Sequence, residues 1–278
     1  MDTKTNKIAA WTIIFIMALV WLIIAGAPFL FMVLTTFKEQ FEVLTSGVFA
    51  FPKTLYIDNF IEVVTGNFFT YFFNSLIVVG ISLAALLFVS ACASYPLARF
   101  KFKLNKPIFG LIVATMAVPI HVTLIPVFIM TQNLGIYDSI WALIGPYIAF
   151  NLPVSTFILT TFMSEIPKEL EEAAEIDGCG KFRTFFEVII PLSKPGLATL
   201  AIYNSVNMWN EFSFALILTQ SMQNRTLPLA IWEYQGQYAM HVPMIMTVLT
   251  LSVLPMIIAF IIGQDKLIKG MMAGAVKG

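Results

Sequence analysis

Six long apolar stretches constrain this chain more than any other feature of its sequence. Each is long enough to cross the hydrocarbon core of a bilayer, about 30 Å thick, as one helix. The composition agrees, because 59% of the residues are hydrophobic and only 12% are charged, whereas soluble domains are about half apolar and about a quarter charged. The sequence therefore predicts an all-α membrane protein. The six predicted transmembrane helices cover residues 8–34, 72–97, 107–130, 140–163, 196–218 and 244–262.

The first stretch, residues 8–34, shares some features with a secretory signal peptide. Lys4 and Lys7 precede it, and small residues at 25–27 form a possible cleavage site. The apolar run nevertheless continues through that site for 27 residues, which is longer than the apolar region of a signal peptide. We therefore expect a helix that is retained.

Lysine and arginine residues are distributed unequally between the two sides that these spans define. Thirteen of the 16 lie on one side, and only Lys38, Lys53 and Arg225 lie on the other. Loops rich in these two residue types stay in the cytoplasm. Both termini and the segment 164–195 are therefore predicted to be cytoplasmic. The two longer loops on the outer side are residues 35–71 and 219–243.

Nothing else in the chain indicates a second domain. The sequence has no internal repeat and no soluble segment of domain length, so residues 1–278 are predicted to form a single transmembrane domain. Cys92 and Cys179 are placed in a span and in a cytoplasmic loop, so we expect no disulfide between them. The net charge of zero indicates no nucleic acid partner.

The cytoplasmic segment 171–192, EEAAEIDGCGKFRTFFEVIIPL, is dense in charge although apolar spans flank it. Its first part is typical of a helix start, because Pro167 suits the first turn and the glutamates suit the positive end of the helix dipole. Gly178 is typical of a helix stop. A second helix is predicted from apolar residues at helical spacing. These are Phe182, Phe185, Phe186, Ile189 and Ile190.

Two interpretations of this helix–turn–helix remain open. It could be an amphipathic loop on the membrane surface, or it could dock against a soluble protein. The acidic first helix is unfavourable beside an anionic inner leaflet. Ala173 and Ala174 leave a patch that another protein can approach closely. These two features favour a cytoplasmic protein partner.

Several motifs resemble those of the MalG-like permeases of carbohydrate ABC importers, and the resemblance covers nearly the whole chain. The residues Glu172-Ala173-Ala174, Asp177-Gly178, Ile189 and Pro191 resemble the EAA loop of ABC importer permeases. Cys179 departs from the pattern, since alanine is more usual there, but it is also small. The other motifs are NSLIVVG (74–80), ASYPLARFKF (93–102), VPIHVTLIPVF (118–128), IPKELEEAAEIDG (166–178), WNEF (209–212), TLP (226–228), GQY (236–238) and AGAVKG (273–278).

The resemblance implies the type I ABC importer permease fold, with six transmembrane helices and a cytoplasmic coupling loop. It also implies a MalF-like second permease subunit, a dimer of ABC ATPase subunits and an extracytoplasmic sugar-binding protein. ATP and magnesium would bind the partner ATPase, and this chain itself would bind no cofactor or metal and catalyse no reaction. The implied location is the cytoplasmic (inner) membrane, and the implied substrate is a carbohydrate, in particular an oligosaccharide.

The resemblance also assigns roles to individual residues. The EAA loop would insert into a cleft on one ATPase, where Glu172 would pair with a basic residue and Gly178 would set the turn. Ile189 and Pro191 would hold the second helix against the membrane domain. The implied ATPase-coupling residues are Glu172, Ala173, Ala174, Asp177, Gly178, Ile189 and Pro191. The outer residues Gly236, Gln237 and Tyr238 resemble the family loop that probes the sugar cleft of the binding protein.

Polar residues inside the spans are candidates for the translocation pathway. Asn204, Asn207, Asn210 and Glu211 lie on roughly one face of the fifth predicted span. They could offer hydrogen bonds to sugar hydroxyls, or they could hydrogen-bond neighbouring helices, and the second interpretation suits Asn210 and Glu211 best. The predicted spans contain no lysine or arginine, which favours a neutral substrate. Further candidates are His121 and Asn151.

Other functions remain as alternatives. The chain could be an ABC importer permease for glycerol phosphate or another small solute. An ion-coupled secondary transporter is disfavoured, because six spans are few and no intramembrane carboxylate pair or histidine–carboxylate relay is evident. A membrane enzyme is also disfavoured, because the sequence contains no metal-ligand cluster, no nucleophile–base pattern and no phosphate-binding glycine loop. ATP hydrolysis is therefore expected in a separate subunit.

Overall fold

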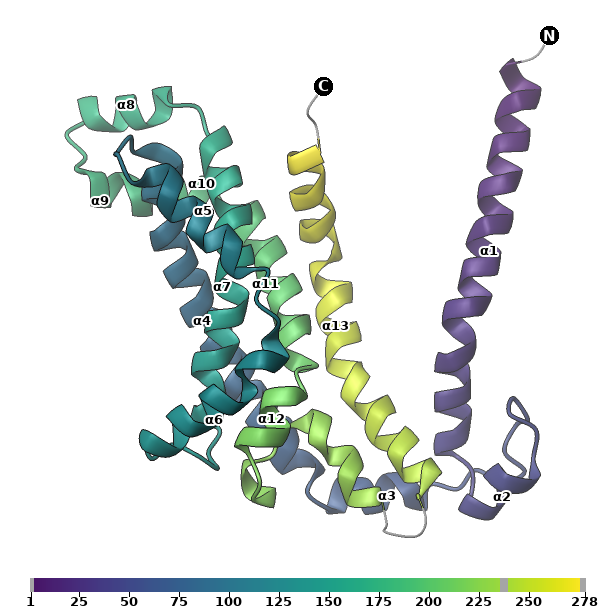
Figure 1. Cartoon of the computed structure of the whole chain (residues 1–278). Coiled ribbons are helices and arrows are strands. Elements are labelled where there is room, and N and C mark those ends of the chain that lie inside the picture. The colour runs from purple at the N-terminus through teal and green to yellow at the C-terminus, as the bar shows by residue number, and fades with distance from the viewer. Residues whose placement is uncertain (1–2, 236–239, 276–278) are drawn as a thin grey trace. The chain divides into compact units, whose positions relative to one another are not determined.

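The computed structural model describes residues 3–235 and 240–275 (Figure 1). The regular elements of these residues are helices, and the only bridge of the β type among them pairs Gln235 with Met240. The chain divides into two compact units, which are described separately. Unit 1 consists of residues 1–68 and 231–254, and unit 2 consists of residues 69–230 and 255–278.

Unit 1 contains a long apolar helix and the loop that follows it. Its helices are α1 (Thr3–Thr36), α2 (Gln40–Thr45), α3 (Asp58–Thr65) and the first part of α13 (Val242–Ala275). The loop folds back on the end of α1, because the buried Asn59 amide donates to the carbonyls of Thr36 and Lys38 at 2.8 and 2.9 Å. The Gln40 side chain ties the same loop to the start of α13, since its Oε1 accepts from the Val242 amide at 3.0 Å.

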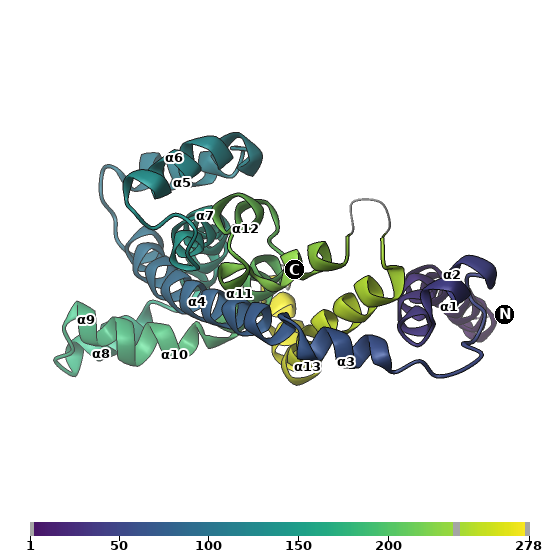
Figure 2. The ribbon, with the colours of Figure 1, turned by 90° about the horizontal axis from the view of Figure 1, so that it is seen from below.

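Unit 2 is built around α4 (Phe68–Arg99), α7 (Trp141–Glu165) and α11 (Lys194–Trp209). Apolar side chains from these three helices and from the π-helical turn (Phe185–Ile189) form one buried cluster. Figure 2 shows α5 and α6 on one side of α7 and the hairpin of α8 and α9 beyond α4. The other helices of this unit are α5 (Asn105–Thr115), α6 (Leu124–Asn133), α8 (Glu169–Ile176), α9 (Lys181–Thr184), α10 (Ile190–Leu192), α12 (Ser213–Leu218) and the latter part of α13. The 3₁₀ turns are Ile120–Thr123, Met222–Asn224 and Leu227–Tyr234.

One glycine allows α11 to approach α7 closely. A Cβ atom at Gly196 would lie 2.9 Å from the ring of Phe162 on α7. Such a distance is shorter than van der Waals contact, so only glycine fits without a shift of the ring. The buried cluster beside this crossing consists of Ala91, Tyr95, Leu159, Met163, Phe185, Ile189 and Leu200.

Four described helices are long and apolar enough to cross a membrane, and there are six crossings if each of two bent helix pairs counts as one span. The four single helices correspond to the predicted spans 8–34, 72–97, 140–163 and 244–262. They run Ala10–Thr36, Phe68–Arg99, Trp141–Glu165 and Val242–Gln264. The bent pairs are Asn105–Thr115 with Ile120–Asn133, at 89°, and Lys181–Leu192 with Lys194–Trp209, at 70°.

The predicted span 107–130 is therefore bent rather than straight. Pro119 lies in the break between α5 and the 3₁₀ turn. It has no amide hydrogen, and it disfavours the helical conformation of the preceding residue, Val118. The backbone amides of residues 116–118 donate to carbonyls three residues earlier. The Val118 amide, for example, donates to the Thr115 carbonyl at 3.1 Å.

The predicted span 196–218 is also interrupted. α11 ends at Trp209, and α12 begins only at Ser213. Asn210 closes α11 by donating from its side chain to the Val206 carbonyl at 2.8 Å. The carboxylate of Glu211 then accepts a hydrogen bond from the backbone amide of Phe214 at 2.8 Å. This amide lies in the first turn of α12, where backbone amides have no acceptor within the helix. The two polar residues therefore form a helix break.

Candidate coupling surface and translocation residues

The first helix of the segment 164–195, α8, is short and has a well-formed end. Its first turn carries three glutamates, which suit the positive end of the helix dipole. At its end Gly178 adopts φ +82°, a left-handed conformation that glycine takes without a steric penalty. The Gly178 amide donates to Glu175 at 3.0 Å, and the Cys179 amide donates to Ala174 at 2.9 Å. These two bonds form a Schellman motif, which fixes where α8 stops.

The two alanines of α8 lie on different faces. Ala174 is buried in unit 2, with 8% of its surface exposed, whereas Ala173 is exposed together with Glu172. Ile176 is also exposed, at 86%, and it lies four residues after Glu172 on the same side of the helix. The sequence did not single out this isoleucine, although its spacing from Glu172 and Ala173 indicates the shared face. We define the α8 surface as Glu169, Glu172, Ala173 and Ile176.

The predicted second helix is divided by the π-helical turn. Pro191 has no amide hydrogen for the carbonyl four residues earlier, and the Ile190 amide instead donates to the Phe185 carbonyl, five residues back. Phe185 and Ile189 are buried in the cluster of unit 2, but Phe182 is 83% exposed. The predicted apolar stripe is therefore only partly packed, because the extra residue of the π turn changes the register of the helix faces.

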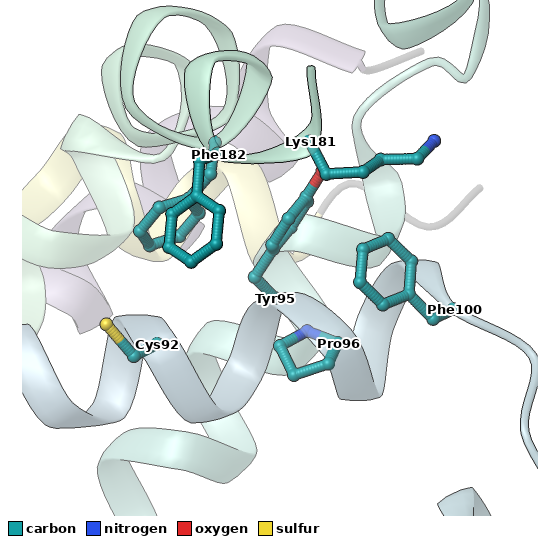
Figure 3. A pocket seen from close by; sticks show the side chains of 7 residues that line it. Cys92, Tyr95, Pro96, Phe100, Lys181 and Phe182 are labelled. Atoms are coloured by element: carbon teal, nitrogen blue, oxygen red, sulfur yellow. The ribbon is translucent and has the colours of Figure 1, made fainter.

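An apolar groove separates this second helix from the end of α4. Figure 3 shows Cys92 and Pro96 on α4 and Phe100 just after its end, with Lys181 and Phe182 facing them from α9. The groove encloses about 260 Å³ and is completed by Tyr95 and Phe185. Its Lys181 also forms an ion pair with Glu175 of α8 and lies 5.9 Å from the centre of the Phe100 ring.

Arg99, the last residue of α4, connects three helices and was not predicted as a site residue. Its Nε donates to Oε2 of Glu171 on α8 at 2.9 Å. Its Nη1 donates to the carbonyls of Met163 and Ile166 at 3.2 and 2.7 Å, at the end of α7. The Arg99 side chain is 2% exposed and the Glu171 side chain is 17% exposed. The start of α8 is thus held by a buried ion pair.

Of the four polar residues predicted on one face of the fifth span, Asn204 is fully buried. Its side-chain amide donates to the Ser155 hydroxyl on α7 at 3.0 Å and to the Leu200 carbonyl at 2.8 Å. This is the interhelical bonding that was one of the two open interpretations. Asn207, one turn further along α11, is exposed. Asn210 and Glu211 make the helix break described above.

The two remaining pathway candidates lie apart from that face. His121 is exposed in the 3₁₀ turn between α5 and α6. Asn151 is partly buried on α7, and its side-chain amide donates to the Tyr147 carbonyl of the same helix at 2.7 Å. Asn151 lies one helical turn before Ser155, the partner of Asn204. The structure thus places Asn151 on α7 one turn before the residue that Asn204 of α11 contacts, and leaves His121 separate from them in the helix break.

The predicted binding-protein loop, Gly236, Gln237 and Tyr238, lies outside the described residues. On either side of it the structure describes Gln235 and Met240, which form the isolated bridge. The role assigned to the three loop residues stays a prediction.

Comparisons with known proteins place these features in a family. Residues 77–272 match the family described as "Binding-protein-dependent transport system inner membrane component". The ABC transporter permease protein ORF2 of Caldicellulosiruptor sp. (strain Rt8B.4) is 55% identical over 264 residues, which is 95% of this chain and 96% of the relative. The melibiose/raffinose/stachyose import permease protein MelC of Bacillus subtilis (strain 168) is 33% identical and covers 90% of this chain and 91% of its own length.

A solved structure shows the same fold. A crystal structure of a bacterial ABC transporter involved in the import of the acidic polysaccharide alginate contains a chain that aligns with a TM-score of 0.80 and 18% identity, over 95% of this chain and 98% of that one. The type I ABC importer permease fold predicted from the sequence is therefore confirmed. The chain belongs to the family of binding-protein-dependent transport inner membrane components. It is a multi-pass transmembrane permease subunit of an ABC importer.

Proposed function

We propose that this permease subunit imports a carbohydrate, in particular a neutral oligosaccharide. The observation that carries the proposal is the run of relatives named for sugar transport over nearly the whole chain. One is the trehalose/maltose transport system permease protein MalG of Thermococcus litoralis, 32% identical over 94% of this chain and 95% of its own length. The predicted spans contain no lysine or arginine, which supports a neutral substrate over an anionic one such as glycerol phosphate.

The proposed assembly contains three further components. A MalF-like permease would supply the other half of the translocation pathway, and a dimer of ATPase subunits would bind ATP and magnesium on the cytoplasmic side. An extracytoplasmic binding protein would deliver the sugar, with Gly236, Gln237 and Tyr238 facing it. A related chain, with a TM-score of 0.71 and 14% identity, comes from an alginate transporter solved with its pentasaccharide-bound periplasmic protein.

The α8 surface supports the proposed contact with the ATPase. It combines acidic Glu172, small Ala173 and Ile176, an apolar side chain that is 86% exposed. The Schellman motif at Gly178 and the buried Ile189 keep this surface fixed at the end of unit 2. The same arrangement requires the cytoplasmic location of both termini that the lysine and arginine distribution predicts.

Among the pathway candidates, Asn207 and His121 have the side chains most available to a passing sugar. Both are exposed. Asn210 is exposed as well, but its side-chain amide, like the side chains of Asn204 and Glu211, is engaged in a hydrogen bond within unit 2. We therefore assign sugar contacts to Asn207 and His121 and structural roles to the other three.

A ligand screen on the cognate binding protein tests the substrate class. Raffinose, stachyose, maltose, trehalose, diacetylchitobiose and arabinotriose would be compared with glycerol 3-phosphate by thermal shift. We expect at least one neutral oligosaccharide to raise the melting temperature. A shift with glycerol 3-phosphate alone would overturn the proposed substrate.

Two substitutions in the coupling segment test the mechanism. Glu172→Lys reverses the charge of the α8 surface, and Gly178→Pro cannot adopt φ +82°. In right-side-out vesicles that carry the whole complex and contain ATP, both variants should abolish uptake of the sugar found in the screen while the protein remains in the membrane. Cys179→Ala, which introduces the residue more usual in the family, is the matched control and should transport normally. Unchanged uptake in Glu172→Lys and Gly178→Pro would contradict the coupling role.

A further inference from the structure

The start of α8 is attached to the rest of unit 2 at few points. Of the α8 residues only Ala174 is buried, and the α8 surface is exposed. Glu171 reaches inward instead and meets the Arg99 guanidinium at 2.9 Å. The Arg99–Glu171 ion pair therefore ties α8 to the span α4, beside Tyr95 of α4, whose hydroxyl also interacts with Glu171.

Arg99 also holds the end of α7 in the same place. Its Nη1 donates to the Met163 and Ile166 carbonyls, which belong to the negative end of the α7 dipole. One side chain thus satisfies a carboxylate from α8 and two carbonyls from α7 while its own backbone ends α4. Figure 1 shows the ends of α4 and α7 beside α8 at this end of unit 2.

The chemistry of arginine makes this arrangement specific. Its planar guanidinium presents five donors in fixed directions and stays charged at any physiological pH, whereas lysine offers a compact charge on a flexible stem. Because Arg99 and Glu171 are both largely out of solvent, separating them would leave each buried charge without its opposite charge, which is strongly unfavourable. The same cost of separating the two charges opposes movement of α8 away from α4.

We propose that Arg99 is a positioning residue that makes α8, α4 and α7 move as one body. A displacement of α8 by the ATPase would then reach both spans without being absorbed at the loop between α7 and α8. This inference rests on the proposed function, because it takes the ATPase as the protein that displaces α8. It assigns to Arg99 and Glu171 a role in transmission that is separate from the contact surface itself.

Spin labels on α8 and α4 measure this tie directly. Leu170→Cys on α8 and Phe88→Cys on α4 are both exposed, at 42% and 60%, and would be labelled in a complex in which Cys92 and Cys179 are replaced by serine. With Arg99 and Glu171 in place, we expect one narrow distance distribution that persists after ATP and vanadate are added to the complex in nanodiscs.

The test variant replaces both members of the pair by apolar residues of similar length, Arg99→Met with Glu171→Met. Such replacements remove the charges together and commonly preserve folding. We expect a broadened distance distribution, and we expect the stimulation of ATP hydrolysis by the binding protein to fall by roughly 2- to 30-fold. The matched control is Arg183→Met with Glu187→Met, an ion pair of the same type whose side chains are 64% and 55% exposed, and it should change neither quantity.

The outcomes separate three cases. Unchanged distances and unchanged stimulation in the Arg99→Met, Glu171→Met variant overturn the proposal, even if the melting temperature of the complex falls, because that pattern belongs to a purely structural ion pair. If this variant does not assemble, Arg99→Lys is measured by the same criteria, and wild-type behaviour there overturns the proposal too. Failure of the proposed function would give a different result, because the wild-type chain would then bind and couple to no ATPase.

Discussion

Two charged side chains, Asp138 and Arg99, hold opposite ends of unit 2 in different ways. Asp138 lies between α6 and α7, at the end that carries α12 (Figure 1). Its Oδ1 accepts from the backbone amides of Gln220 and Ser221 at 2.8 and 2.9 Å, and its Oδ2 accepts from the Ser221 hydroxyl. Arg99, at the α8 end, is buried and paired with a carboxylate on another helix.

The two ends differ in the groups that stabilise the charged side chain. The Asp138 carboxylate is stabilised by backbone and hydroxyl dipoles of one loop, and its own φ of 52° adapts the chain to that loop. The Arg99 guanidinium depends on Glu171, a side chain on an element that we propose to be displaced during transport. The end at Asp138, which the predicted topology makes the outer end, is therefore closed by local geometry. The end at Arg99, the predicted inner end, is closed by an ion pair between two helices.

Removing one member of the inner pair should give the largest loss of stability. Arg99→Met leaves the Glu171 carboxylate buried without its cation, and breaking a buried pair in this way costs about 3–5 kcal/mol. Thermal unfolding of the purified complex in detergent would show a lower melting temperature than for the Arg99→Met, Glu171→Met double variant. Equal melting temperatures for the two variants would mean that Glu171 is well solvated without Arg99.

The corresponding change at the outer end should cost less. Asp138→Ala leaves the amides of Gln220 and Ser221 without their acceptor, and a lost acceptor of this kind costs about 1–3 kcal/mol. Because these donors lie in one loop near solvent, water can replace part of the lost bonding. We expect a smaller drop in melting temperature than for Arg99→Met, with Asp138→Asn between Asp138→Ala and wild type. A larger drop in melting temperature for Asp138→Ala than for Arg99→Met would contradict the comparison.

Acid should weaken the outer end of unit 2 by protonating the Asp138 carboxylate. Burial alone would raise the pKa of the Asp138 carboxyl, but hydrogen bonds from the side chain and backbone of Ser221, and from the backbone of Gln220, lower the pKa below its usual 3.8 overall. A carboxyl whose pKa is lower in the folded state contributes stability above its unfolded pKa, and loses it as the pH falls through the folded value. The difference in melting temperature between wild type and Asp138→Asn should thus be constant from pH 7 to about 5 and shrink below about 4.

The sequence predicted the spans and the coupling segment well, because hydropathy, charge and turn chemistry act over short distances. Gly178 illustrates this, since a helix stop of that kind is visible in the residues on either side of it. The helix break at Asn210–Glu211 was not predicted, because a run of apolar residues has the same mean hydropathy whether its helix is continuous or broken. The pairing of Arg99 with Glu171 could not be predicted either, since 72 positions separate the two residues and only the packing of α4 against α7 brings them together.

The exposed pair Arg183 and Glu187 gives the smallest expected effect and defines the lower limit of the comparison. The two side chains lie one helical turn apart, with the Nε–Oε2 distance at 2.9 Å, as short as in the Arg99–Glu171 pair. Their carboxylate and guanidinium remain in water, however, and exposed pairs of this kind contribute little to stability. Arg183→Ala should therefore leave the melting temperature of the complex within experimental error, and its small effect should vanish when the salt concentration is raised. A drop comparable to that of Arg99→Met would show that distance rather than burial determines what an ion pair contributes in this segment.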